Sequence, residues 1–417
     1  MAASRFQELL WANGQRGITS ICSAHPMVIR AAAEQAGGER GLLLIEATCN
    51  QVNQDGGYTG MQPADFRDFV QETVRRSGFP EERLLLGGDH LGPHPWRKLT
   101  AQDAMAKAET MIEAYAKSGF TKIHLDASMP CANDPAILPD EIIAKRAAQL
   151  AQVAESSAVR APFYIIGTEV PVPGGASQGH ELAVTAPAAA SDTLSIHRKA
   201  FADAGIQKAW ERVVGLVVQP GVEFDNVSVT DYQPEKAGEL VQWRRQNAQN
   251  IVFEAHSTDF QRDFAYGALV TDGFAILKVG PGLTFVMREA IFALADIEKE
   301  IVALANQSRL VETIRATMMK NSAHWQDYYK GPDWETLLFN SYSDRIRYYW
   351  PDPGIAAAFT RLVANLSGKP IPDILLSRYL PAQYRRVRSG ELKPDPEALI
   401  LDKVRDVLRV YATACRT

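Results

Sequence analysis

The sequence predicts an α/β fold, a TIM (β/α)8 barrel with a helical C-terminal extension. Two observations support this fold class: short apolar runs recur eight times within residues 1–310, and helical stretches of ordinary length separate most of them. Each run is continuous rather than alternating, as expected for strands of a parallel sheet that is buried on both faces. Small and polar residues follow every run, which favours a closed barrel over a doubly wound open sheet with one switch point.

The predicted strands are short and rich in leucine and β-branched residues. They cover residues 17–22, 42–45, 84–86, 122–125, 163–166, 213–218, 251–253 and 274–277. The clearest helices between them are predicted at residues 101–118, 140–157, 192–204 and 234–249. We therefore expect one barrel domain over residues 1–310.

The pattern changes after residue 310. Residues 311–417 are helical in character, with a cluster of aromatic residues followed by proline- and arginine-rich segments. We expect this region to be a helical C-terminal extension that packs on the barrel. Its aromatic residues also favour a homo-oligomer.

Composition limits the classes of protein that this chain can belong to. Of its 417 residues, 46% are hydrophobic and 22% are charged, and the formal net charge is −5. This acidic balance argues against nucleic-acid binding, which needs a basic face. The four cysteines lie far apart, and neither a signal peptide nor a membrane-spanning run is present. We expect a cytoplasmic protein that binds neither nucleic acid nor membranes.

Ionisable residues follow most of the predicted strands. In a barrel the carboxyl ends of the strands meet at one face, where the active site is assembled. So many carboxylates at one face would repel each other unless a cation or protons neutralised them. The residues concerned are Glu46, Asp89, His90, Asp126, Glu169, Glu223, Glu254, His256 and Lys278.

A divalent metal is the simplest neutralising group. His90 and His256 supply imidazole nitrogens, and Glu169 is the best carboxylate candidate for a third ligand. This set suits zinc or manganese with one position left for a substrate oxygen. The alternative for each histidine is a structural hydrogen bond, and we expect that role for His124 because it lies within a strand.

Four of the carboxylates are candidate catalytic groups. Asp89 is the sharpest candidate because it adjoins His90, so that it can move a proton on a substrate hydroxyl while a metal holds the carbonyl. The alternative is that Asp89 caps the next turn. The other three candidates are Glu46, Asp126 and Glu223.

Two segments are candidates for phosphate binding. Gly280 and Gly282 precede a probable helix, whose N-terminus attracts anions, and Lys278 is interpreted as a phosphate or substrate contact rather than a Schiff-base amine. In the extension, Arg345 and Arg347 lie among aromatic residues and can clamp a phosphate, unless they are solvated arginines on a helix face. Glycine-rich loops at residues 56–61 and 172–181 are predicted lids.

These segments together resemble one family closely, over essentially the whole chain. That family is labelled tagatose 6-phosphate kinase and is also described as the non-catalytic subunit of class II tagatose-bisphosphate aldolase. Some of its members are described as 4-epimerases that interconvert tagatose 6-phosphate and fructose 6-phosphate. The segments are EATCNQVNQDGGYTGM (46–61), GGDHLGP (87–93), HLDASM (124–129), GTEVPVPGG (167–175), EAHSTDFQ (254–261), LKVGPGLTF (277–285) and SYSDRIRYYW (341–350).

The resemblance implies a role in carbohydrate metabolism, such as galactitol catabolism, with a divalent metal and a small phosphorylated ketose. It implies that Asp89 is the acid/base and that His90 binds metal, as in class II aldolases. The kinase label finds no support, because the sequence contains neither a GxxxxGK[ST] loop nor a kinase catalytic segment. A sugar-phosphate 4-epimerase, an isomerase with aldolase-like chemistry, is the function that we expect. The alternatives are an accessory partner of a class II aldolase catalytic subunit and a standalone aldolase.

Overall fold

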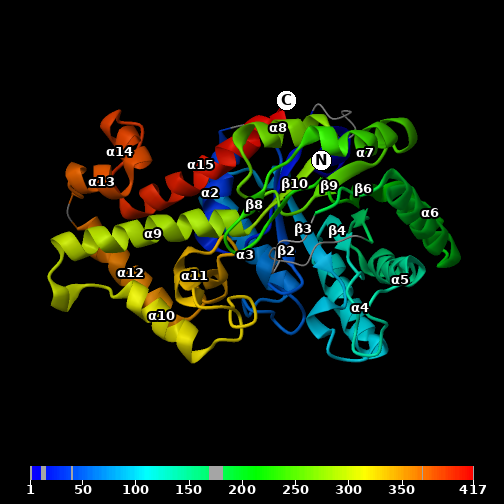
Figure 1. The fold of residues 1–417 in the computed structure, drawn as a ribbon, viewed down its shortest axis with the longest axis horizontal. Helices are drawn as coiled ribbons and strands as arrows, with labels where there is room; N and C mark the ends of the chain where they lie inside the picture. Colours follow the sequence, from blue (N-terminus) through cyan, green and yellow to red (C-terminus); the bar gives the residue numbers. More distant parts are fainter. Residues whose placement is uncertain (1, 11–15, 39–40, 169–181, 369, 417) are drawn as a thin grey trace.

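A computed structural model gives the structure of the chain and describes residues 2–10, 16–38, 41–168, 182–368 and 370–416. Eight parallel strands form a closed barrel in the order β1-β10-β9-β6-β5-β4-β3-β2, which confirms the predicted TIM barrel (Figure 1). The strands are β1 (Ile18–Ile21), β2 (Leu43–Thr48), β3 (Leu84–Leu91), β4 (Lys122–Leu125), β5 (Phe163–Ile166), β6 (Val213–Val217), β9 (Val252–Ala255) and β10 (Ile276–Val279).

Helices surround this barrel, and many of them begin at a proline, whose fixed φ and missing N–H suit the first helical position. Examples are α3 and α9, which begin at Pro63 and Pro281. The helices that follow barrel strands are α2 (Pro26–Gly37), α3 (Pro63–Arg76), α4 (Ala101–Lys117), α5 (Asp140–Ser157), α6 (Pro187–Asp203), α7 (Pro234–Asn247), α8 (Asp263–Thr271) and α9 (Pro281–Ile301). A short antiparallel pair, β7 (Glu223–Phe224) and β8 (Val229–Thr230), lies between β6 and α7.

The first helix, α1 (Ala2–Leu10), covers the amino-terminal end of the barrel. Its residues Phe6 and Leu10 are buried in one apolar cluster with residues near the starts of the strands, such as Ile18, Leu85 and Phe163. The rings of Phe6 and Phe163 meet edge to face, with centroids 5.6 Å apart. Because this end is filled with apolar side chains, the polar interior lies at the opposite, carboxyl-terminal end.

The helices after α9 gather on one side of the barrel, away from α4, α5 and α6 (Figure 1). They are α10 (Leu310–Lys320), α11 (Trp334–Asn340), α12 (Pro353–Ser367), α13 (Asp373–Tyr379), α14 (Pro381–Arg388) and α15 (Pro396–Arg416). The last of them, α15, packs against α2, α8 and α9. Its residue Tyr411 donates a hydrogen bond to the carbonyl of Thr258, 2.9 Å away, just beyond β9. The end of the chain thus supports a loop at the carboxyl-terminal face.

Within the described residues, no helix is both long enough and apolar enough to cross a membrane.

Candidate functional site

Asp89 and His90 both reach the centre of the carboxyl-terminal face because β3 is irregular at its end. The pairing of β3 with β4 shifts register between Gly88 and Leu91, and His90 has a left-handed backbone with φ of 49°. A regular strand would send adjacent side chains to opposite faces, whereas a bulge redirects one of them. A non-glycine residue in this conformation costs on the order of 1–3 kcal/mol, so the surrounding structure must hold it there.

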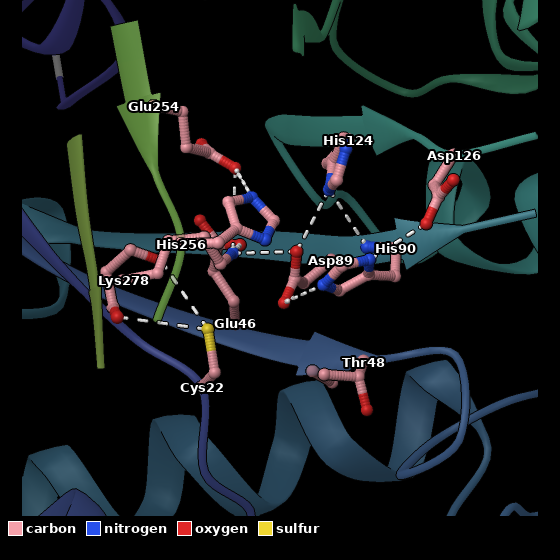
Figure 2. A network of polar contacts seen from close by, with 12 residues as sticks. Cys22, Glu46, Thr48, Asp89, His90, His124, Asp126, Glu254, His256 and Lys278 are labelled. Atoms are coloured by element: carbon pink, nitrogen blue, oxygen red, sulfur yellow. Dashed lines mark hydrogen bonds and ion pairs between the residues drawn. The ribbon is translucent and has the colours of Figure 1, made fainter. Parts of the chain in front are cut away.

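Three histidines from separate strands, His90, His124 and His256, form an imidazole cluster (Figure 2). Their ring centroids lie 4.8 to 5.2 Å apart, and all three side chains are buried. Each ring is paired with a carboxylate through one nitrogen, which fixes its orientation. The pairs are His90 Nδ1 with Asp126 Oδ2 at 2.8 Å, His256 Nε2 with Glu254 Oε1 at 2.9 Å, and His124 Nδ1 with Asp89 Oδ1 at 3.0 Å.

The position of His124 differs from the sequence-based expectation of a purely structural residue. Its side chain faces the barrel interior from β4, and the His90 amide lies 3.2 Å from the same Nδ1 that contacts Asp89. Its Nε2 atom is buried and has no hydrogen-bond partner among the described residues. A buried ring nitrogen without a partner is costly in a purely structural residue, and it is a feature of a ligand-binding histidine.

Two buried lysines join the carboxylates into what we call the ionic centre: Glu46, Asp89, Lys122, Glu254 and Lys278. Lys278 Nζ lies 2.7 Å from both Glu46 Oε2 and Asp89 Oδ1. Lys122 Nζ lies 2.7 Å from both Glu46 Oε1 and Glu254 Oε2. Gly87 makes room for this arrangement, because a Cβ at that position would lie 2.8 Å from the Cγ of Glu46.

The protonation states follow from burial and from these charges. Burial disfavours the ammonium form of Lys278, but Asp89, Cys22, Glu46 and Glu254 together outweigh it, so the pKa of Lys278 lies well above its usual range. Burial likewise raises the pKa of Asp89, yet the neighbouring His90 and Lys278 lower it well below its ordinary value. Burial lowers the pKa of His256 to about 3. Asp89 is therefore a carboxylate, His256 is neutral, and the charged Lys278 amine is a poor Schiff-base nucleophile.

The donor set fits a divalent cation. One ligand atom from each of Asp89, His90, His124 and His256 lies within 4.8 Å of the others. The four carboxylates Glu46, Asp89, Asp126 and Glu254 outnumber the two lysines, and a divalent ion bound by neutral imidazoles would balance this excess of negative charge. Glu169, the carboxylate ligand expected from the sequence, lies outside the described residues, as does the predicted lid at residues 172–181.

A cavity of about 470 Å³ opens onto this site. Asp89, His90, His256 and Lys278 line it, together with Arg347, Tyr348 and Trp350 from after α9, which we call the cover. Two ring contacts join the cover to barrel loops: Tyr348 with Tyr58, and Trp350 with His25, at centroid distances of 4.7 and 5.7 Å. Tyr58, Thr59 and Met61, from the loop predicted to be a lid, also line the cavity.

The two arginines of the predicted phosphate clamp lie in different places. Arg347 lines the cavity and donates hydrogen bonds to the Tyr348 hydroxyl, at 3.0 Å, and to the Ser343 carbonyl. Arg345 lies outside that cavity, where its guanidinium is 3.3 Å from the ring centroid of Tyr328. It contributes instead to a second cavity, together with Arg97, Lys98, Lys320 and His324.

The predicted glycine-rich phosphate loop is occupied by a carboxylate of the chain itself. Asp259 Oδ1 accepts hydrogen bonds from the amides of Gly280, at 3.0 Å, and Gly282, at 2.7 Å. These amides are therefore not free to bind phosphate, contrary to the expectation from the sequence. The reason is the loop after β9, which turns Asp259 towards the start of α9.

The remaining catalytic candidates lie at different distances from the cavity. Asp126 contacts His90, and Glu46 is buried in the ionic centre, so both act on the site through neighbours. Glu223 is half-buried in β7 and accepts a hydrogen bond from the Phe224 amide at 3.0 Å. Phe224 lines the cavity, whereas Glu223 is not among the described lining residues.

The sequence-based interpretation missed His124, Lys122 and Asp259. A signal for the first two is present in KIHL, since residues 122 and 124 alternate along a strand and share one face. Glu254 and His256 show the same spacing. No comparable signal marks Asp259, because its role depends on a contact across a loop.

The fold and the site define a TIM-barrel protein with a buried centre of carboxylates, lysines and imidazoles at its carboxyl-terminal face. The model of one family, the "D-tagatose-1,6-bisphosphate aldolase subunit GatZ/KbaZ-like" family, matches residues 7–416. The chain belongs to this family.

Two solved structures are similar to the chain. One is a probable tagatose 6 phosphate kinase from Sinorhizobium meliloti 1021, with 53% identity and a TM-score of 0.89, over 96% of this chain and all of that one. The other is a fructose-bisphosphate aldolase from Campylobacter jejuni, with 14% identity and a TM-score of 0.43, over 87% of this chain and 91% of that one. The second likeness assigns no role to any residue.

Proposed function

We propose that this protein is a metal-dependent ketose-phosphate 4-epimerase that interconverts D-tagatose 6-phosphate and D-fructose 6-phosphate. One observation carries the proposal: the Asp89 carboxylate and the imidazoles of His90 and His256 line the same cavity. Retro-aldol chemistry needs a base that removes a hydroxyl proton and a cation that stabilises the resulting enediolate. Membership of a family whose description names an aldolase subunit supports the same chemistry.

Inversion at C4 of a 2-ketose requires a bond to that carbon to break, and retro-aldol cleavage of C3–C4 breaks one. Asp89 removes the proton from the C4 hydroxyl, C4 becomes an aldehyde, and the electron pair of the C3–C4 bond passes into an enediolate over C2 and C3. The aldehyde rotates, C3 attacks its other face, and protonated Asp89 returns the proton to the new C4 oxygen. Atoms and charge balance, and no fragment leaves.

The residues around Asp89 suit these reaction steps. Lys278 keeps Asp89 ionised and presents an ammonium group to the cavity, where it can stabilise negative charge on a substrate oxygen. Asp126 orients His90, and Glu254 orients His256. Glu46 holds Lys278 in place from β2. We propose no catalytic role for Glu223.

His90, His124 and His256 would hold the cation, with Glu169 as a further candidate ligand. When bound, a divalent ion such as zinc or manganese would act as a Lewis acid towards the substrate carbonyl. Arg347 would bind the substrate phosphate, since a half-buried guanidinium at the cavity wall is a strong partner for that group. The cover formed by Tyr348 and Trp350 would keep the aldehyde fragment enclosed.

Carbon-13 NMR of the protein incubated with tagatose 6-phosphate and a divalent metal tests the proposal. We expect fructose 6-phosphate to form without free triose, and we expect Asp89→Asn to abolish its formation. Asp68→Asn, at an exposed site on α3, should leave the rate unchanged. Absence of fructose 6-phosphate with every metal tried would refute the epimerase, and accumulation of triose would indicate a standalone aldolase.

A second candidate function is an accessory role, which the word "subunit" in the family description favours. In that case the chain alone would be inactive, and it would stabilise or activate a class II aldolase catalytic subunit. Thermal unfolding of such a subunit with and without this protein distinguishes the two functions. A rise in its midpoint, together with no epimerase activity, would favour the accessory role.

A further inference from the structure

The start of α9 has the features of a phosphate site. It follows the last barrel strand, carries glycines at positions 280 and 282, and begins a helix of 21 residues that reaches the cavity wall. The N-terminus of such a helix attracts anions through its unpaired amides and its dipole.

The amides in the first turn of α9 are all used within the chain. Those of Gly280 and Gly282 donate to Asp259 Oδ1, and Pro281 has no N–H. The amides of Leu283 and Thr284 donate to the Gly280 carbonyl, at 3.1 and 3.5 Å. A phosphate at this place would have to displace Asp259 and overcome the repulsion of its carboxylate.

Asp259 is built firmly into this position. Its side chain is 3% exposed, and a Cβ added at Gly282 would lie 2.9 Å from its Oδ1, so glycine at 282 permits the close approach. The preceding residue, Thr258, is held from α15, since Tyr411 bonds to it. Asp259 nevertheless lines the cavity, where it can accept a hydrogen bond from a neutral hydroxyl.

Two cations, Lys278 and Arg347, line the cavity, and Lys278 is already paired with Glu46 and Asp89. Arg347 reaches the cavity from the covering segment. Behind that cover, the second cavity is lined by the further cations Arg97, Lys98, Lys320 and Arg345. A phosphate is therefore attracted to Arg347, whereas the Asp259 carboxylate disfavours a phosphate on the amides of Gly280 and Gly282.

We propose that Asp259 is a specificity-determining residue that excludes phosphate from the α9 end of the cavity, so that the site selects a ketose with one phosphate over a ketose bisphosphate. This rests on the proposed function, because it assumes a phosphorylated ketose as ligand. Asp259 takes the place that a second phosphate would need, and it accepts a hydrogen bond from the free hydroxyl at that end of the sugar.

Calorimetric binding of two hexitol phosphates tests the inference. Hexitol 6-phosphate and hexitol 1,6-bisphosphate lack the carbonyl, so neither can react and affinity alone is measured. We expect wild type to bind the monophosphate on the order of tenfold or more tightly than the bisphosphate, because the Asp259 carboxylate repels a second phosphate. Asp259→Ala should shift the ratio of the two dissociation constants towards the bisphosphate by a similar factor.

Two further variants complete the design. Asp259→Asn keeps the acceptor for both glycine amides without the charge, so it should shift the ratio in the same direction even if the alanine variant does not fold. Asp263→Asn, at an exposed carboxylate in the first turn of α8, should leave the ratio unchanged. Equal binding of both compounds by wild type, or an unchanged ratio in folded Asp259→Asn, overturns the inference. If neither compound binds wild type, the proposed function fails instead.

Discussion

Asp126 Oδ2 lies 2.8 Å from His90 Nδ1, across the carboxyl ends of two neighbouring strands. Both side chains are buried, so the carboxylate fixes the ring and leaves Nε2 as the nitrogen available to a ligand. Carboxylates in this position usually strengthen metal binding by histidine.

Replacing Asp126 by asparagine should therefore weaken divalent-metal binding roughly 10–100-fold, because the amide orients the ring without its charge. Metal titration followed by calorimetry measures the effect independently of turnover. Asp68→Asn serves as the control. Unchanged metal affinity in Asp126→Asn would show that the pair is only structural.

Arg347→Ala should raise the KM for the phosphorylated ketose on the order of 10–100-fold, with a much smaller change in kcat, because a charge-assisted hydrogen bond to the phosphate is lost. Steady-state kinetics separates the two constants. Lys98→Ala, which removes an exposed cation from the neighbouring cavity, should change neither by more than about twofold. A fall in kcat at constant KM would contradict a phosphate-binding role.

Lys122→Met should lower the free energy of unfolding by about 3–5 kcal/mol, because Glu46 and Glu254 lose a buried partner. Adding Glu254→Gln to this variant should recover part of the loss, since one unpaired charge is removed. Denaturation with urea measures both. Lys107→Met, at a half-exposed ion pair with Asp55, should cost at most about 1 kcal/mol. If Lys122→Met and Lys107→Met lost the same free energy of unfolding, the ionic centre would not be important for stability.

His197 makes the stability of the protein dependent on pH. Burial lowers its pKa from 6.5 to about 4 in the folded chain. Between these values the unfolded chain binds more protons than the folded chain, so stability rises with pH, and it is lost as the pH falls from about 7 towards 4. When the pH reaches the pKa of the folded chain, this group has lowered the free energy of unfolding by roughly 3 kcal/mol.

His197→Asn should therefore be less stable than wild type at pH 7.5 but lose less stability on acidification. Its amide can still donate to the Thr193 carbonyl, which His197 Nδ1 contacts at 2.9 Å. Urea midpoints at pH 7.5 and pH 5 measure the difference. If the urea midpoints of wild type and His197→Asn differed by the same amount at both pH values, His197 would not be the origin of the pH dependence.

The sequence was sufficient to predict the barrel because its strands are continuous apolar runs that stop at small or polar residues. The run at 163–166 forms a strand with those bounds. It was also sufficient to predict that Asp89, His90, His256 and Lys278 share one cavity, since the carboxyl ends of parallel strands meet.

What could not be predicted depends on side-chain direction and on contacts across loops. Lys122 and His124 lie within a short strand, and only the barrel register shows that both face inward. The hydrogen-bond partner of the Gly280 and Gly282 amides could not be predicted either, because Asp259 reaches them from a loop more than 20 residues earlier in the chain.

The cover of the cavity comes late in the chain. The last barrel strand ends at Val279, whereas Arg347, Tyr348 and Trp350 follow only after three further α-helices, α9 to α11, and their loops. During synthesis, every strand of the barrel leaves the ribosome before these three residues are made. A nascent chain thus presents its ionic centre to solvent first and acquires the means to enclose a sugar phosphate last.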